Sequence, residues 1–139
     1  MLLGLGVRTI HEESDGVATI EAIRTLNPDI LLINWSLSVL DGCDVIGIIR
    51  HLDFPKPEIP IILMTDNSTV SRITEALEIG VHEILLKPFS PRALEQRLRT
   101  VVTVQRPMVR MKGRYVPQAR TDASCQIDLQ AISRAKVTA

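Results

Sequence analysis

Three short apolar runs are spaced along the chain, and a polar residue closes each of them. The runs are Ile30–Ile33, Ile61–Met64 and Ile84–Leu86. None of them alternates between apolar and polar residues, which is the pattern of a strand buried on both faces. A β-branched stretch at Val7–His11 predicts one further strand ahead of them.

Apolar residues recur at helical spacing in four segments between and after these runs. The predicted helices cover about 17–26, 41–50, 68–80 and 91–102. Asp41 and Ser90 are expected to cap the second and the fourth helix. Asn67 or Ser68 is expected to cap the third. In the second helix we expect four residues to face the core: Val45, Ile46, Ile48 and Ile49.

Strands that alternate with helices of this length predict an α/β fold with a parallel sheet. The carboxyl ends of parallel strands meet at one edge, where open α/β sheets place their functional sites. Asn34, Thr65 and Lys87 close the three apolar runs. We therefore expect a side-chain amide, a hydroxyl and an ammonium to lie close together at that edge.

The charge of the chain is divided unevenly, although its 139 residues have no formal net charge. Residues 1–105 carry 9 Lys/Arg and 14 Asp/Glu, and residues 106–139 carry 7 Lys/Arg and 2 Asp/Glu. Because the second segment lacks a regular apolar period, we expect one domain over 1–105 and a basic, mostly disordered tail over 106–139.

Several classes of protein are excluded by composition. Cys43 and Cys125 are too few and too unpatterned for a disulfide framework or a zinc site, and they fit a reducing cytoplasm. No apolar run approaches the roughly 20 residues that cross a bilayer, so we expect no membrane contact. No glycine-rich phosphate loop follows the first strand.

The combined spacing of Asn34, Asp41-Gly42, Thr65 and Lys87-Pro88 resembles the receiver domain of two-component response regulators, the CheY-like superfamily. The resemblance covers about residues 7–104. It implies a flavodoxin-like parallel sheet with helices on both faces and the strand order 2-1-3-4-5. The family has Asp where Asn34 stands, Ser or Thr where Thr65 stands, and Lys-Pro at the positions of Lys87-Pro88.

Two departures from the family pattern concern its chemistry. The phosphoacceptor position holds Asn34, and the family's first strand, most of its first helix and its acidic metal-binding pair have no counterpart before Met1. Of the usual metal ligands, the resemblance leaves only the backbone carbonyl of Ser36. We therefore expect no Mg²⁺ cofactor and no enzymatic activity. Thr65 and Lys87 match the family's phosphoryl-contacting pair.

The resemblance implies a non-phosphorylatable receiver-like module, a pseudo-receiver, that acts by protein docking without an output domain. A histidine kinase or a phosphotransferase is the expected kind of partner, with no specific nucleic acid. Arg106–Arg110 and Gly113–Tyr115 resemble the end of a stand-alone subgroup of receivers. Two alternatives stay open: an inactive fragment of a stand-alone response regulator whose start codon or gene is truncated, and a different flavodoxin-like enzyme.

The absence of the family's first strand predicts an exposed sheet edge. Either Ile30–Asn34 lies at that edge, or Val7–His11 moves over to pair with it. Exposed edges promote self-association. The tail, by contrast, is expected to be dispensable for folding, because ordering it costs backbone entropy with little burial in return.

Overall fold

The computed structural model describes residues 9–37, 39–66, 69–104, 106–118 and 136–138. Within these ranges, no helix is both long enough and apolar enough to cross a membrane. The elements follow one another in this order: β1 (Thr9–His11), α1 (Gly16–Leu26), β2 (Ile30–Asn34), α2 (Gly42–Ile49), β3 (Ile61–Thr65), α3 (Val70–Ile79), β4 (Glu83–Leu86), α4 (Pro91–Thr103), β5 (Met108–Met111), β6 (Arg114–Pro117) and β7 (Lys136–Thr138).

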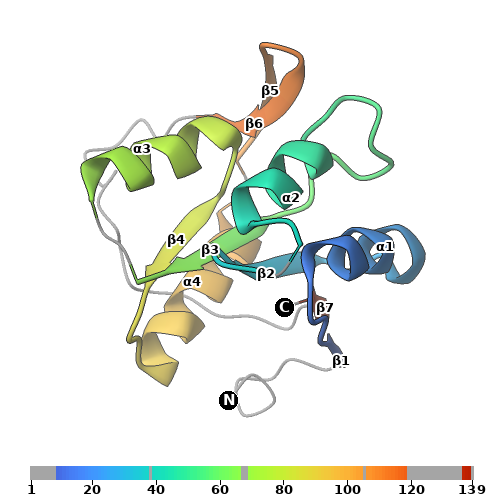
Figure 1. The fold of residues 1–139 in the computed structure, drawn as a ribbon. Coiled ribbons are helices and arrows are strands. Elements are labelled where there is room, and N and C mark those ends of the chain that lie inside the picture. The colour runs from blue at the N-terminus through green and yellow to red at the C-terminus, as the bar shows by residue number, and fades with distance from the viewer. Residues whose placement is uncertain (1–8, 38, 67–68, 105, 119–135, 139) are drawn as a thin grey trace.

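Five strands form one parallel sheet in the order β1-β7-β2-β3-β4, and β5 and β6 form a separate hairpin (Figure 1). Each step from β2 to β4 is a strand–helix–strand unit, which is why these neighbours in sequence are also neighbours in the sheet. The predicted α/β fold with a parallel sheet and helices on both faces is confirmed.

The strands are buried on both faces, as their continuous apolar runs predict. Leu31 and Ile33 belong to a core that includes residues of α1, α2 and α3. Ile30 and Leu32 belong to a second core with residues of α4. Because successive strand residues point to opposite faces, two cores divide the same runs between them.

Most of the predicted helix starts are observed. Asp41 accepts from the Asp44 N–H at 2.9 Å, and Ser90 accepts from the Ala93 N–H at 3.1 Å. Asn67 and Ser68 lie outside the described residues, and Thr69 is the N-cap of α3. The prediction that Ile48 faces the core is wrong, because its side chain is 39% exposed on the outer side of α2.

The expected arrangement of the sheet edge is also wrong. β7, from the C-terminal end of the chain, lies between β1 and β2 and pairs in parallel with both. Thr9, Ile10 and His11 pair with β7 on one side, and Ile30 and Leu31 pair with it on the other. β2 is therefore not an edge strand, and β1 does not pair with it. The backbone groups of both strands find partners in a distant segment, which explains the difference.

The expected basic tail contains a second ordered element. β5 and β6 pair in antiparallel register, from Met108 with Pro117 to Met111 with Arg114. Lys112 and Gly113 have positive φ angles of 50° and 79°, as a two-residue turn between paired strands requires. The expectation of disorder is therefore wrong for β5, β6 and β7. For residues 119–135 it lies outside the described residues.

A buried arginine joins the ends of several elements. Arg50, which follows α2, has no exposed surface. Its guanidinium donates to the carbonyls of Gly80, Pro57 and Ile59 at 2.7–2.8 Å and contacts His82 Nδ1 at 3.1 Å. Burial lowers the pKa of Arg50 to about 9, which still leaves the side chain charged at neutral pH.

The same residue anchors the hairpin. The Arg50 carbonyl accepts from the Tyr115 N–H at 2.9 Å, and His51 forms an antiparallel bridge with Arg114. Val116 is 7% exposed and adds apolar contact. The hairpin therefore leaves the body from a fixed base beside the C-terminal end of α2, and its turn projects away from the sheet (Figure 1).

Candidate functional site

The carboxyl ends of β2, β3 and β4 carry the three polar residues that the sequence singles out. In the sheet register, Asn34 pairs with Met64 and Thr65 pairs with Leu86. Lys87 follows β4, and its N–H donates to the Thr65 carbonyl at 2.8 Å. Its Nζ donates to Asn34 Oδ1. The structure thus brings Asn34, Thr65 and Lys87 together, while their functional roles stay predictions.

The site offers few ligands for a divalent cation. Mg²⁺ prefers hard oxygen ligands that include carboxylates. Asn34 presents a neutral oxygen that already accepts from Lys87, and Ser36 is an exposed loop residue after β2. In the part of the chain that the structure describes, no group of three or more His, Cys, Asp or Glu is placed to hold a metal. The expectation that this edge binds no Mg²⁺ stays a prediction.

A buried tryptophan directly follows Asn34 at the end of β2. Trp35 is 8% exposed, and its carbonyl accepts from the Gly42 N–H at 2.7 Å. The Arg72 guanidinium, from α3, lies 4.2 Å from the centroid of the indole ring. Cation–π contact of this kind stabilises both groups. The sequence did not predict the contact between Arg72 and Trp35, because nothing in the local pattern distinguishes Arg72 from a solvated charge on α3.

Gly42 allows β2 and α2 to approach each other closely. A Cβ atom at this position would lie 2.3 Å from the Asn34 carbonyl oxygen. We expect Gly42→Ala to lower the free energy of unfolding by about 1–3 kcal/mol, because the backbone must shift to relieve the overlap. Urea unfolding of dilute protein measures this difference.

Gly47 in the same helix provides a matched control. The nearest atom to a Cβ at that position is Ile79 Cδ1, at an ordinary contact distance of 3.8 Å. Gly47→Ala is therefore expected to raise the free energy of unfolding by about 0.4–1 kcal/mol. Equal destabilisation by the two substitutions would contradict the role of close approach at Gly42.

The one cysteine near this edge is not poised for nucleophilic chemistry. Cys43 is buried beneath the start of α2. Burial, followed by the nearby carboxylates of Glu75, Asp41 and Asp44, raises the pKa of its thiol to about 12. The thiolate is the reactive form, so burial and these carboxylates disfavour nucleophilic chemistry at Cys43.

Comparison with known sequences agrees with the geometry of the strand ends. Residues 1–99 match the family model described as "Response regulator receiver domain". The chemotaxis protein CheY1 of Helicobacter pylori is 29% identical over 99 residues, which are 70% of this chain and 79% of CheY1. The DNA-binding response regulator MtrA of Mycolicibacterium paratuberculosis is 31% identical over 85 residues, which are 61% of this chain and 36% of MtrA.

Solved structures give the same result for the fold. The receiver domain of the sensor histidine kinase PA1611 from Pseudomonas aeruginosa is 29% identical, with a TM-score of 0.56 over 64% of this chain and 71% of that chain. The receiver domain of the Francisella response regulator 1452 is 30% identical, with a TM-score of 0.50 over 55% of this chain and 60% of that chain. With its flavodoxin-like parallel sheet and its polar residues at the ends of β2, β3 and β4, this chain belongs to the response regulator receiver-domain family.

Proposed function

We propose that this chain is a pseudo-receiver, a receiver-domain module of two-component signalling that does not accept a phosphoryl group. One observation carries the proposal: the Lys87 ammonium donates to the side-chain oxygen of Asn34, where a phosphorylatable receiver has a carboxylate. An amide oxygen is a poor nucleophile compared with a carboxylate, which forms the covalent acyl phosphate in such transfers.

The surroundings of Asn34 support the same proposal. Phosphoryl transfer requires a cation that offsets charge on the phosphoryl oxygens. The receiver domain of PA1611 is described with a magnesium ion coordinated in its active-site cleft. In this chain β7 lies where the sheet order of receivers places the first strand, and Lys136–Thr138 contains no carboxylate side chain. Within the described part of the sheet, the strand at this place therefore supplies no carboxylate, in keeping with the proposal.

A module that accepts no phosphoryl group can still act by binding another protein. Receiver domains interact with histidine kinases and phosphotransferases in signalling, and we propose that this chain binds a partner of that kind in a phosphate-independent way. The Lys87–Asn34 hydrogen bond ties the end of β4 to the end of β2 and so keeps the strand ends in one arrangement.

Incubation with acetyl phosphate and Mg²⁺ is expected to leave the chain unmodified. Intact-mass spectrometry should show no species that carries an added phosphoryl group, because no anionic acceptor is present at position 34. A receiver that is known to accept phosphate from acetyl phosphate serves as the positive control in the same buffer. Phosphorylation of the unmodified chain on any residue would contradict the proposal.

Asn34→Asp separates the missing nucleophile from the missing cation site. The substitution supplies a carboxylate but no further metal ligand, so we expect phosphorylation to stay far below that of the positive control. Efficient, Mg²⁺-dependent phosphorylation of this variant would show that other groups hold the cation, and Asp66, next to Thr65, would be the first to test.

A further inference from the structure

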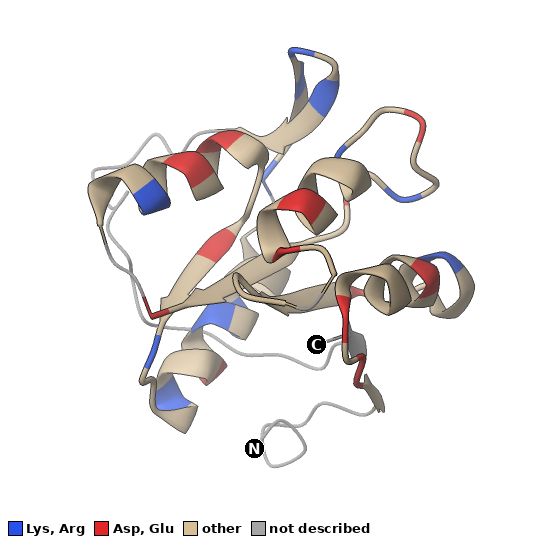
Figure 2. Ribbon diagram, viewed as in Figure 1, with Lys and Arg blue, Asp and Glu red and all other residues tan. Residues whose placement is uncertain are grey.

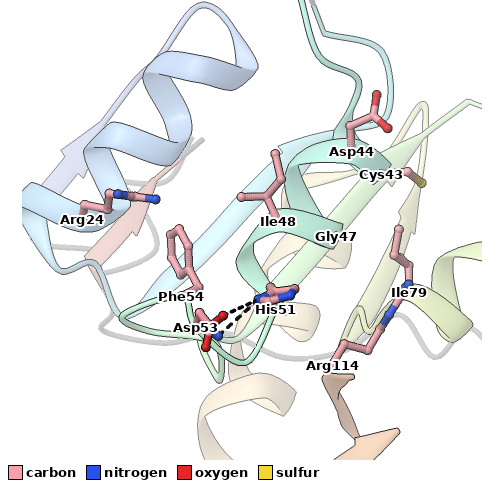
Figure 3. Close-up of a pocket in the computed structure, with 10 residues that line it drawn as sticks. All are labelled: Arg24, Cys43, Asp44, Gly47, Ile48, His51, Asp53, Phe54, Ile79 and Arg114. Atoms are coloured by element: carbon pink, nitrogen blue, oxygen red, sulfur yellow. Dashed lines mark hydrogen bonds and ion pairs between the residues drawn. The ribbon is translucent and has the colours of Figure 1, made fainter. Parts of the chain in front are cut away.

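A groove of about 510 Å³ runs over the outer face of α2, away from the strand ends that form the candidate site. Figure 3 shows Cys43 and Asp44 at one end of it, and His51, Asp53 and Arg114 at the other. α1 and the end of α3 flank the groove. None of the residues assigned to the phosphoryl site lines it.

Gly47 and Ile48 of α2 line the middle of the groove. Ile48, which the sequence places in the core, is 39% exposed here. Gly47 lies beside it in the middle of α2, where glycine is less favourable to a helix than alanine. A Cβ at Gly47 would meet only Ile79 Cδ1, at 3.8 Å, so the packing of this chain does not require glycine. Small side chains are what allow two helices to come close together.

The two ends of the groove carry opposite charge. Near the N-terminal end of α2, exposed acidic residues lie on α2 and on the adjacent α3 (Figure 2). They are Asp41, Asp44 and Glu75, whose carboxylates all lie near Cys43 at the start of α2. At the other end the hairpin is basic: residues 106–118 contain four Lys/Arg and no Asp/Glu. The exposed charges of the hairpin belong to Arg110 and Lys112, and the partly exposed Arg114 lines the groove.

The remaining charged residues around the groove have contacts within the chain. At the basic end, Asp53 lies 3.7 Å from His51 Nδ1, and Arg24 lies over the ring of Phe54. At the acidic end, Arg72 lies over the indole ring of Trp35. Asp53 and Glu78, which lies near the end of α3, offset part of the positive charge at the hairpin end. The basic residues there outnumber them: Arg24, Arg110, Lys112 and Arg114. The net pattern is one acidic and one basic end, separated by about the length of α2.

We propose that this face binds a second copy of the same chain. With the two α2 helices antiparallel and crossing near Gly47, the acidic end of each copy lies against the basic hairpin of the other. A twofold axis makes this contact twice, because the surface is complementary to itself. This dimer uses a different surface from the sheet edge that the sequence points to, and it does not depend on the proposed function.

The salt dependence of association is the first test, with the full chain studied by sedimentation equilibrium over a concentration series. Charge pairs at an exposed rim are screened as ionic strength rises. We expect a monomer–dimer equilibrium at low salt that weakens when NaCl is added. A chain that stays monomeric at low salt, or one whose association strengthens with salt, overturns the proposal.

Paired charge reversals give the decisive test. Arg110→Glu with Lys112→Glu makes the hairpin acidic, and Asp44→Lys with Glu75→Lys makes the opposite end basic. Each double variant alone is expected to dimerise at least about tenfold more weakly, because like charges then face each other. An equimolar mixture of the two should recover the dimer as a heterodimer, since both contacts are again between opposite charges.

Two further variants define the surface. Gly47→Leu is expected to weaken the dimer at least about tenfold, because its side chain fills the point of closest approach. Arg92→Glu with Arg99→Glu changes the same charge on α4 and should leave the dimer unchanged. Circular dichroism is the check that every variant is folded. A mixture of the reversed variants that stays monomeric, or a dimer that persists in Gly47→Leu, overturns the proposed interface.

Discussion

Deleting residues 136–139 is expected to lower the melting temperature by more than about 10 °C. β7 pairs with three residues of β1 and two residues of β2. Its loss therefore removes the backbone pairing of both neighbouring strands. At about 0.5–1.5 kcal/mol for each net hydrogen bond, the deletion is expected to cost about 3–5 kcal/mol. That is a large part of the 5–15 kcal/mol that is typical of a domain. Differential scanning calorimetry measures the change.

Substitutions at Val137 test the same strand without shortening the chain. The residue lies at the middle of β7, opposite both Ile10 and Ile30. Val137→Pro removes a backbone donor and should reproduce much of the loss, because proline is not tolerated within a sheet. Val137→Ile keeps the donor, the β-branched shape and the apolar side chain, and it should lose much less stability than Val137→Pro. If the deletion leaves the melting temperature unchanged, the tail is dispensable after all.

The deletion is also expected to increase association between copies of the chain. Without β7, both β1 and β2 would expose backbone donors and acceptors along an unpaired edge. Such edges promote association between copies of a protein. We expect the shortened chain to bind hydrophobic dyes and to aggregate more than the full chain. A shortened chain that stays monomeric and binds no dye would show that these edges are covered in another way.

Arg50→Met is expected to lower the free energy of unfolding by about 3–5 kcal/mol. Methionine can fill much of the space, but the carbonyls of Gly80, Pro57 and Ile59 lose the guanidinium donor. Each buried acceptor left without a partner costs about 1–3 kcal/mol. His82 Nδ1 still accepts from the Ile61 N–H at 3.3 Å. Urea unfolding followed by circular dichroism measures the loss.

Two controls distinguish geometry from charge. Arg50→Lys keeps the positive charge but cannot direct donors at three carbonyls in the plane of a guanidinium, so we expect it to lose more than half as much stability as Arg50→Met. Arg92→Met removes an exposed charge from α4 and should change the free energy of unfolding by less than about 0.5 kcal/mol. An Arg50→Met variant as stable as Arg92→Met would contradict the proposed role of Arg50.

Local patterns in the sequence determined the central part of the fold. The continuous apolar runs at Ile30–Ile33 and Ile61–Met64 have no polar face, so each had to be a strand covered on both sides. Asp41 and Ser90 marked helix starts, because their side chains accept from the free N–H groups of a first turn. Strand–helix alternation then fixed parallel neighbours, and the polar residues after β2, β3 and β4 had to meet at one edge.

Contacts between distant segments were decided only in the tertiary structure. β7 has three residues, which are too few to show a period. Its pairing depends on β1 and β2 lying one strand apart, so that a strand fits between them. The turn at Lys112-Gly113 lacks the Asn-Gly or Asp-Gly signal of a two-residue hairpin. Arg50 looks like a solvated charge in the sequence, but in the fold it is buried and donates to carbonyls of two other segments, the loop with Pro57 and Ile59 and the turn at Gly80. The local spacing of residues predicts a helix or a strand. The hydrogen-bond partners of that element lie far away in the chain, so local spacing does not predict them.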